Sequence, residues 1–189
     1  MKTKVKIGDD YYTADTSAIT ALRYRAWFNK SILTSGFTED DALDVLYVSV
    51  SDVFDYDNFR EYALDMKYAK DMCISAGGVL EGVMKDSGVK REVIQKADER
   101  MKDDGNTIFD EFTIISVITN IGLSFDLMKE VSLMQLMYIT AQTYEMKYGK
   151  DKDGVKITKM SQEERKQIYS ITKEDEDRIR EYLNKKKVD

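Results

Sequence analysis

The chain opens with alternating polar and apolar residues, a pattern that predicts a β-hairpin over residues 3–14. Val5 and Ile7 alternate with lysines, a Gly-Asp-Asp turn follows, and two tyrosines then favour a second strand. A hairpin of two strands is only marginally stable in water by itself. We therefore expect it to lie on helices or to extend another sheet.

Beyond the hairpin, apolar residues recur at the three- and four-residue steps of an amphipathic helix. Thr16 or Ser17 caps a first predicted helix, which ends near Leu33. A second predicted helix, over residues 42–54, follows Thr38 and three acidic residues, which favour a helix N-terminus. Its valines would also suit a strand, but the capping pattern favours the helix.

The clearest amphipathic pattern begins at Asp57 or Asn58 and continues to Ala76. It predicts one long helix, with Cys73 on the apolar face as a small core residue. A cluster of glycines starts at Gly77. Because glycines interrupt helical patterns, this cluster is the best hinge candidate in the chain.

The pattern becomes less clear in the second half of the chain. Residues 89–101 resume helical spacing, whereas residues 108–121 are so apolar and β-branched that helix and strand both stay open. A helix over residues 133–148 begins with a capping-box pattern, Ser132 and Gln135. Apolar residues spread around this helix, so it is either buried on several sides or covers a partner.

These elements predict a mainly α fold: a compact helical bundle with an N-terminal β-hairpin and a charged C-terminal helical tail. We divide the chain into a hairpin-plus-helical domain (1–105), an apolar helical segment that packs on it or on a partner (106–148), and a polar linker with C-terminal helices (149–189). None of the 189 residues is proline, which supports the helical interpretation because proline disrupts helix interiors.

Residue types that carry much of enzyme chemistry are scarce. The chain has no histidine and one cysteine, which removes the commonest general base, His-based zinc sites and internal disulfides. No phosphate-binding or nucleophile-elbow motif occurs. We expect a protein that is not an enzyme and holds no cofactor or metal, although 35 acidic residues leave a carboxylate-bound metal open.

The charge and hydropathy of the chain limit its partners and location. The net charge of −6 argues against nucleic acid as the main partner. No segment approaches the roughly 20 apolar residues of a membrane span, and no signal peptide is present, so we expect a cytoplasmic protein. The acidic excess lies in residues 1–149, which suggests an acidic inhibitor as an alternative, but acids and bases alternate along most helices.

Methionine and tyrosine are unusually frequent, with 10 and 12 copies. Most would fill the core, but flexible, polarisable methionine also suits an adaptable surface that binds other proteins. The predicted partner-binding residues combine one tryptophan with methionines and tyrosines in or near the 133–148 helix: Trp27, Met128, Met134, Met137, Tyr138 and Tyr144.

Two segments carry a family resemblance. The opening, KVKIGDDYYTADTSAITALRYRAWFNKSIL, combines a short hairpin and a glycine-containing turn with a helix that holds a basic-aromatic stretch. Further on, ITNIGLSFDLMKEVSLMQLMYI sets a GLS turn before a helix rich in leucine and methionine. Both resemble tail assembly chaperones of long-tailed (siphovirus-type) phages of Gram-positive bacteria, the second matching a segment that some members add in a longer, frameshifted form. The resemblance covers roughly residues 1–148.

The resemblance implies a function. Such chaperones bind the long helical tape-measure protein in the host cytoplasm, keep it soluble, recruit tail-tube subunits and are absent from the mature virion. The implied partners are therefore the tape-measure and tail-tube proteins, with a homo-oligomer as a further possibility, and neither nucleic acid nor a membrane. The alternative is a phage counter-defence inhibitor that acts by binding a basic host protein.

Overall fold

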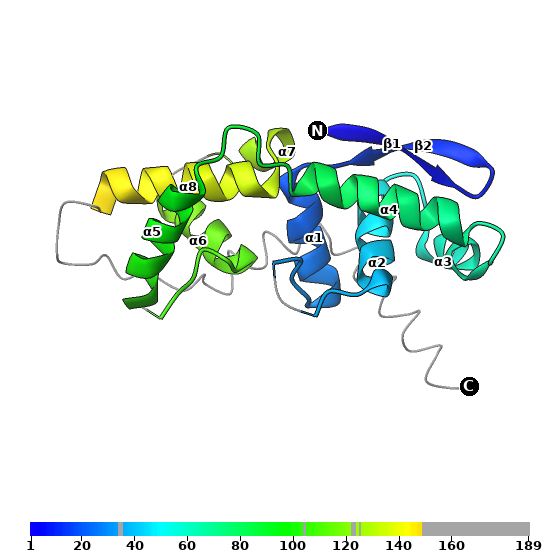
Figure 1. The fold of residues 1–189 in the computed structure, drawn as a ribbon, viewed down its shortest axis with the longest axis horizontal. Coiled ribbons are helices and arrows are strands. Elements are labelled where there is room, and N and C mark those ends of the chain that lie inside the picture. The colour runs from blue at the N-terminus through cyan, green and yellow to red at the C-terminus, as the bar shows by residue number, and fades with distance from the viewer. Residues whose placement is uncertain (34–35, 104, 122–123, 125, 149–189) are drawn as a thin grey trace.

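The computed structural model describes residues 1–33, 36–103, 105–121, 124 and 126–148, and this part of the chain is mainly helical (Figure 1). It contains a two-stranded sheet and eight helices: β1 (Lys2–Ile7), β2 (Asp10–Asp15), α1 (Ala18–Phe28), α2 (Glu39–Val50), α3 (Tyr56–Leu64), α4 (Ala69–Val83), α5 (Arg91–Asp103), α6 (Glu111–Ile121), α7 (Leu127–Glu130) and α8 (Leu133–Tyr148). The predicted mainly α fold with an N-terminal hairpin is confirmed. The predicted C-terminal tail and its helices lie outside the described residues.

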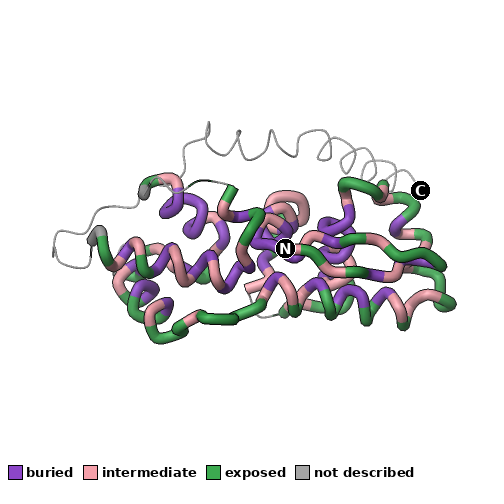
Figure 2. The backbone as a smooth tube through the Cα atoms, turned by 90° about the horizontal axis from the view of Figure 1, so that it is seen from above, coloured by how far each residue is buried: buried purple, intermediate pink, exposed green. Residues whose placement is uncertain are grey.

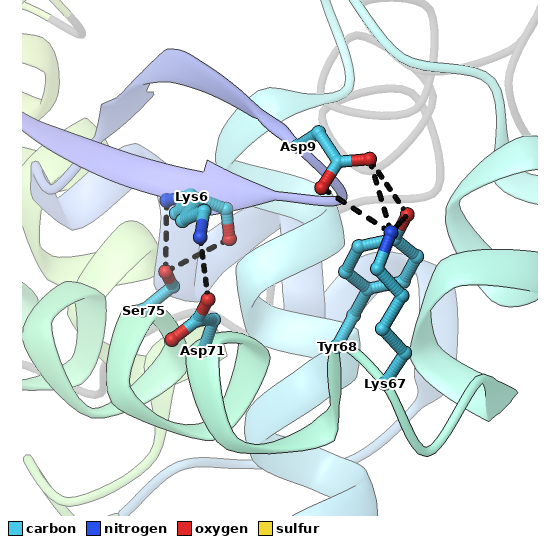
Figure 3. A network of polar contacts seen from close by, with 6 residues as sticks. All are labelled: Lys6, Asp9, Lys67, Tyr68, Asp71 and Ser75. Atoms are coloured by element: carbon cyan, nitrogen blue, oxygen red, sulfur yellow. Dashed lines mark hydrogen bonds and ion pairs between the residues drawn. The ribbon is translucent and has the colours of Figure 1, made fainter.

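The hairpin lies on α4, as expected for a sheet too small to be stable alone. β1 and β2 pair in antiparallel register, with Val5 opposite Tyr12. Val5 and Ile7 are buried, and the backbone of Lys6 exchanges two hydrogen bonds with the Ser75 hydroxyl, of 2.9 and 3.0 Å (Figure 3). The ammonium of Lys6 also lies 2.7 Å from Asp71 Oδ2. The helix therefore supplies both an apolar floor and polar anchors for the first strand.

Helix α1 begins where the sequence predicts, but it is shorter than expected. It ends at Phe28 instead of near Leu33, because Asn29 adopts a left-handed conformation with φ of 53° and terminates the helix. In α2, Thr38 and Asp41 form a complete capping box. The helical interpretation of residues 42–54 is thus confirmed, with the helix itself running from Glu39 to Val50.

The long helix predicted from residue 57 to residue 76 is wrong, because the chain breaks into α3 and α4. Asp55 caps α3 by accepting a hydrogen bond from the Asn58 amide, and Asp65 ends α3 in an extended conformation. After the break, α4 turns Met72 and Val79 into the core and leaves Cys73 exposed. Cys73 is therefore a surface residue, which corrects its predicted place in the core.

Three glycines of the cluster do not interrupt the helix, contrary to the sequence prediction. Helix α4 runs without interruption through Gly77, Gly78 and Gly82, although glycine in a helix interior is less favourable than alanine by about 1 kcal/mol. A Cβ atom at Gly82 would lie 2.7 Å from the Cβ of Thr16, so this glycine permits close packing. Burial of the inner side of α4 against α2 and β1 outweighs the unfavourable glycines.

The second half of the described chain resolves the ambiguity left by its composition. Residues 111–121 form α6, so the 108–121 segment is helical instead of a strand. Before α8, Ser132 and Gln135 form the predicted capping box, with reciprocal hydrogen bonds of 3.1 Å. Helices α5 and α8 pack together, and Arg100 contacts Glu145 between them at 3.1 Å.

The helices gather on both sides of α1 (Figure 1). Helices α2, α3 and α4 with the hairpin lie on one side, and α5, α6 and α8 lie on the other. One continuous hydrophobic core joins the two sides, and the buried positions recur along the helices of both (Figure 2). Helix α5 lies against α8, across the boundary at residue 105 that the sequence suggests, so the domain division stays a prediction.

Candidate functional site

Most residues that the sequence predicts as a partner-binding surface lie in the core. Met128, Met134, Met137 and Tyr144 are at most 9% exposed. Helices α1, α5, α6 and α7 pack around α8 and cover its apolar residues. The prediction of an exposed surface is therefore wrong for these four residues. Apolar residues spread around much of α8 because its own chain buries the helix on several sides.

The remaining two predicted residues are half-buried. The ring of Trp27 lies 6.0 Å from that of Tyr47, centroid to centroid, and its Nε1 is buried without a hydrogen-bond partner among the described residues. The hydroxyl of Tyr138 accepts a hydrogen bond from Gln142 Nε2 at 2.9 Å. Their role in binding a partner stays a prediction.

The exposed apolar side chains concentrate at a different place. In the described part of the chain, five of seven large apolar residues with strong exposure lie on the hairpin, the loop before α3, α3, the turn between α3 and α4, and α4. We call four of them the apolar corner; they are 64–92% exposed: Tyr11, Val53, Leu64 and Met66. Scattered single apolar residues are normal on a protein surface, whereas a local concentration indicates an interaction site.

The elements that carry the apolar corner meet at one end of the molecule (Figure 1). Gly8, with φ of +65°, turns the hairpin so closely over α3 that a Cβ there would lie 2.5 Å from the Tyr62 ring. The ring of Tyr62 lies 6.0 Å from that of Phe54, in the loop between α2 and α3. The hairpin tip, this loop and the turn between α3 and α4 are thus held against a common aromatic cluster.

Polar contacts fix the hairpin tip to the start of α4 (Figure 3). Tyr68 donates a hydrogen bond of 2.8 Å to Asp9 Oδ2, and the ammonium of Lys67 lies 3.3 Å from the same oxygen. These two donors, first Tyr68 and then Lys67, hold the pKa of the Asp9 carboxyl below its usual value. The same kind of contact, with Asp71, raises the pKa of Lys6. The neighbouring apolar side chains are therefore presented on an anchored framework.

The sequence pattern hides the apolar corner. Met66 continues the helical spacing of the predicted 57–76 helix, where it would be a core residue. The break after Leu64 removes Met66 from that stripe, and both Leu64 and Met66 are exposed. Tyr11 follows the strand alternation, which does not tell which face of a two-stranded hairpin is covered.

A polar cleft of about 590 Å³ forms a second candidate site, between the end of α1, the start of α2 and residues 107–110. Asp41 is one of the lining residues, is 4% exposed, and accepts hydrogen bonds from Tyr24, Lys30 and Thr38. Burial alone would raise the pKa of Asp41, but these donors outweigh it and hold the pKa well below its usual range. Arg25 lies 3.8 Å from Asp110 across the cleft.

Two carboxylates near this cleft have raised pKa values. Burial raises the pKa of Asp44 to about 6, against the opposing influence of Arg60 and Lys30. Burial likewise raises the pKa of Glu111, whose Oε1 accepts a 2.8 Å hydrogen bond from Ser31. No group of three or more potential metal-ligating side chains is found within the described ranges. Since the cleft charges pair with each other, this arrangement supports a structural role.

Comparisons with known proteins do not assign the chain to a family: no family model, curated protein or solved structure matches it. Among the described helices, none is both long and apolar enough to cross a membrane.

Proposed function

We propose that this protein is a tail assembly chaperone of a long-tailed phage. It binds the tape-measure protein in the host cytoplasm, keeps it soluble, recruits tail-tube subunits and leaves before the virion is complete. The apolar corner is the observation that carries this proposal. The resemblance of two segments to the chaperone family supplies the nature of the client.

The side chains of the apolar corner suit a long helical client. Methionine and leucine offer flexible apolar contacts, and Tyr11 adds a ring with a polar end. A helical client presents apolar residues as a stripe, and a stripe can lie against such side chains. Asp9 and Lys67 border the corner with both signs of charge, which favours a client with charges beside its apolar stripe.

The opening segment that resembles the family forms the hairpin and α1. The tip of that hairpin holds Tyr11 and is fixed to the turn that follows Met66. The opening segment that carries the resemblance thus contributes Tyr11 to the proposed client site.

The test is co-expression with a candidate tape-measure protein, followed by purification of the soluble complex. We expect the tape-measure protein to be insoluble alone and soluble in the complex. Met66→Glu places a charge in the proposed contact and should weaken the complex about tenfold or more, as expected for losing one buried apolar side chain.

Met146→Glu is the matched control. Met146 is 76% exposed, compared with 92% for Met66, but it lies on α8, away from the apolar corner. We expect this variant to bind as the unchanged protein does. A tape-measure protein that is equally soluble alone, or a complex that resists Met66→Glu and loses binding with Met146→Glu, would contradict the proposal.

A further inference from the structure

One side of α4 is left uncovered by every described element. Four exposed residues follow each other along it at steps of four, three and four residues: Lys70, Ile74, Gly77 and Glu81. In Figure 1 α4 lies in front of α2 and below the hairpin, which together cover its other sides. This spacing is that of a seam between two packed helices. We call these residues the α4 seam.

The glycines of α4 distinguish the uncovered side from the packed side. Gly82 is explained within the chain, because Thr16 occupies the place of a Cβ atom. At Gly77 a Cβ would meet nothing within 4 Å, so no contact with the described residues requires glycine there. A glycine on an exposed helix face allows another backbone to approach closely.

The seam is self-complementary. Along α4 the seam reads lysine, isoleucine, glycine, glutamate. When a second copy runs antiparallel, with a two-fold axis between residues 75 and 76, each of these residues faces a complementary one on the other helix. Lys70 then faces the partner's Glu81, and Ile74 faces the partner's Gly77. Each isoleucine, 64% exposed in the single chain, fills the space that the opposite glycine leaves open. A two-fold interface requires such reciprocal contacts.

We infer that α4 is the dimerisation helix of this protein and that its partner is a second copy of the chain in antiparallel orientation. The opposite charges at the two ends of the seam favour this orientation, since a parallel pair would place Lys70 against the same lysine. The seam is shorter than a standard protein interface, so the dimer is reversible and depends on concentration. This inference does not depend on the proposed client, because the apolar corner uses other residues.

Sedimentation equilibrium of the full chain over a range of concentrations tests the inference. We expect a reversible monomer–dimer equilibrium. Lys70→Glu and Glu81→Lys each place two like-charge pairs in the interface and should raise the dissociation constant about tenfold. The charge reversal Glu92→Lys on α5 is the matched control and should leave the equilibrium unchanged.

Mixing the two single variants gives the sharpest result. In the heterodimer of Lys70→Glu with Glu81→Lys, both facing charged pairs are again of opposite charge, so an equimolar mixture should dimerise more tightly than either variant alone. The double variant Lys70→Glu/Glu81→Lys should also form a dimer by itself.

Three outcomes would overturn the inference: a monomer at all concentrations, a dimer that is indifferent to both single variants, or a mixture that stays monomeric. Circular dichroism of each variant verifies that the helices persist. Both single variants should still bind the client. A failure of the dimer inference is therefore distinguishable from a failure of the proposed function.

Discussion

Two carboxylates one turn apart on α2 respond to burial in opposite ways. Asp41 meets three donors, which stabilise its charged form, whereas Asp44 has a buried oxygen without a hydrogen-bond partner among the described residues. The pKa of Asp44 is therefore raised to about 6, while that of Asp41 is lowered. The number of acids in the sequence does not reveal this difference, because it depends on which side chains the fold brings to each carboxylate.

We expect Asp44→Asn to stabilise the protein at neutral pH. The folded state holds a proton on Asp44 up to about pH 6, whereas the unfolded chain releases it near pH 4. The ionised carboxylate thus destabilises the fold increasingly as the pH rises through this window. In urea unfolding at pH 7.5, the free energy of unfolding of Asp44→Asn should exceed that of the unchanged protein by on the order of 1–2 kcal/mol, and this difference should disappear at pH 4. A gain that is equal at both pH values would show that ionisation is not its cause.

Elements with strong local signals agree with the sequence, and the differences arise at contacts between elements. The caps at Thr38 and at Ser132 with Gln135 were predictable because a capping box is complete within four residues. The break between α3 and α4 was not predictable from the sequence, because the apolar spacing continues through Met66. That break is fixed by the hairpin tip, through Asp9 and Tyr68, and these lie 59 residues apart in sequence.

The glycines of α4 allow a matched test at the scale of one helix. Gly82→Ala should destabilise the protein, because its Cβ would come within 2.7 Å of Thr16 and force the hairpin-to-α1 connection to move. Gly78→Ala should stabilise it by about 0.5–1 kcal/mol, because the new methyl group meets nothing within 4 Å and alanine favours the helix. Thermal unfolding of both variants measures the difference. If the two substitutions shift the melting temperature in the same direction, the assignment of Gly82 to close packing is wrong.

At the scale of the whole molecule, the location of the candidate site could not be read from the sequence. Helix α8 is apolar around most of its surface, which is equally consistent with a buried helix and with a binding face. The fold buries Met137 and Tyr144 and exposes Leu64 and Met66 at the other end. The packing of the later helices around α1 decides which apolar helix is covered. The sequence of a single segment does not reveal that packing.

The continuous core predicts that the described part of the chain unfolds as one unit. Trp27, the only tryptophan, lies on α1, the helix that stands between the two groups, and its ring lies 6.0 Å from that of Tyr47 on α2. Met137→Ala on α8 and Leu46→Ala on α2 each empty a fully buried site and should lower the free energy of unfolding by about 2–5 kcal/mol. Because α8 and α2 both pack against α1, each substitution should shift the same single transition of Trp27 fluorescence. A Trp27 transition that moves with Leu46→Ala but stays in place with Met137→Ala would show instead that the helices after residue 105 unfold independently.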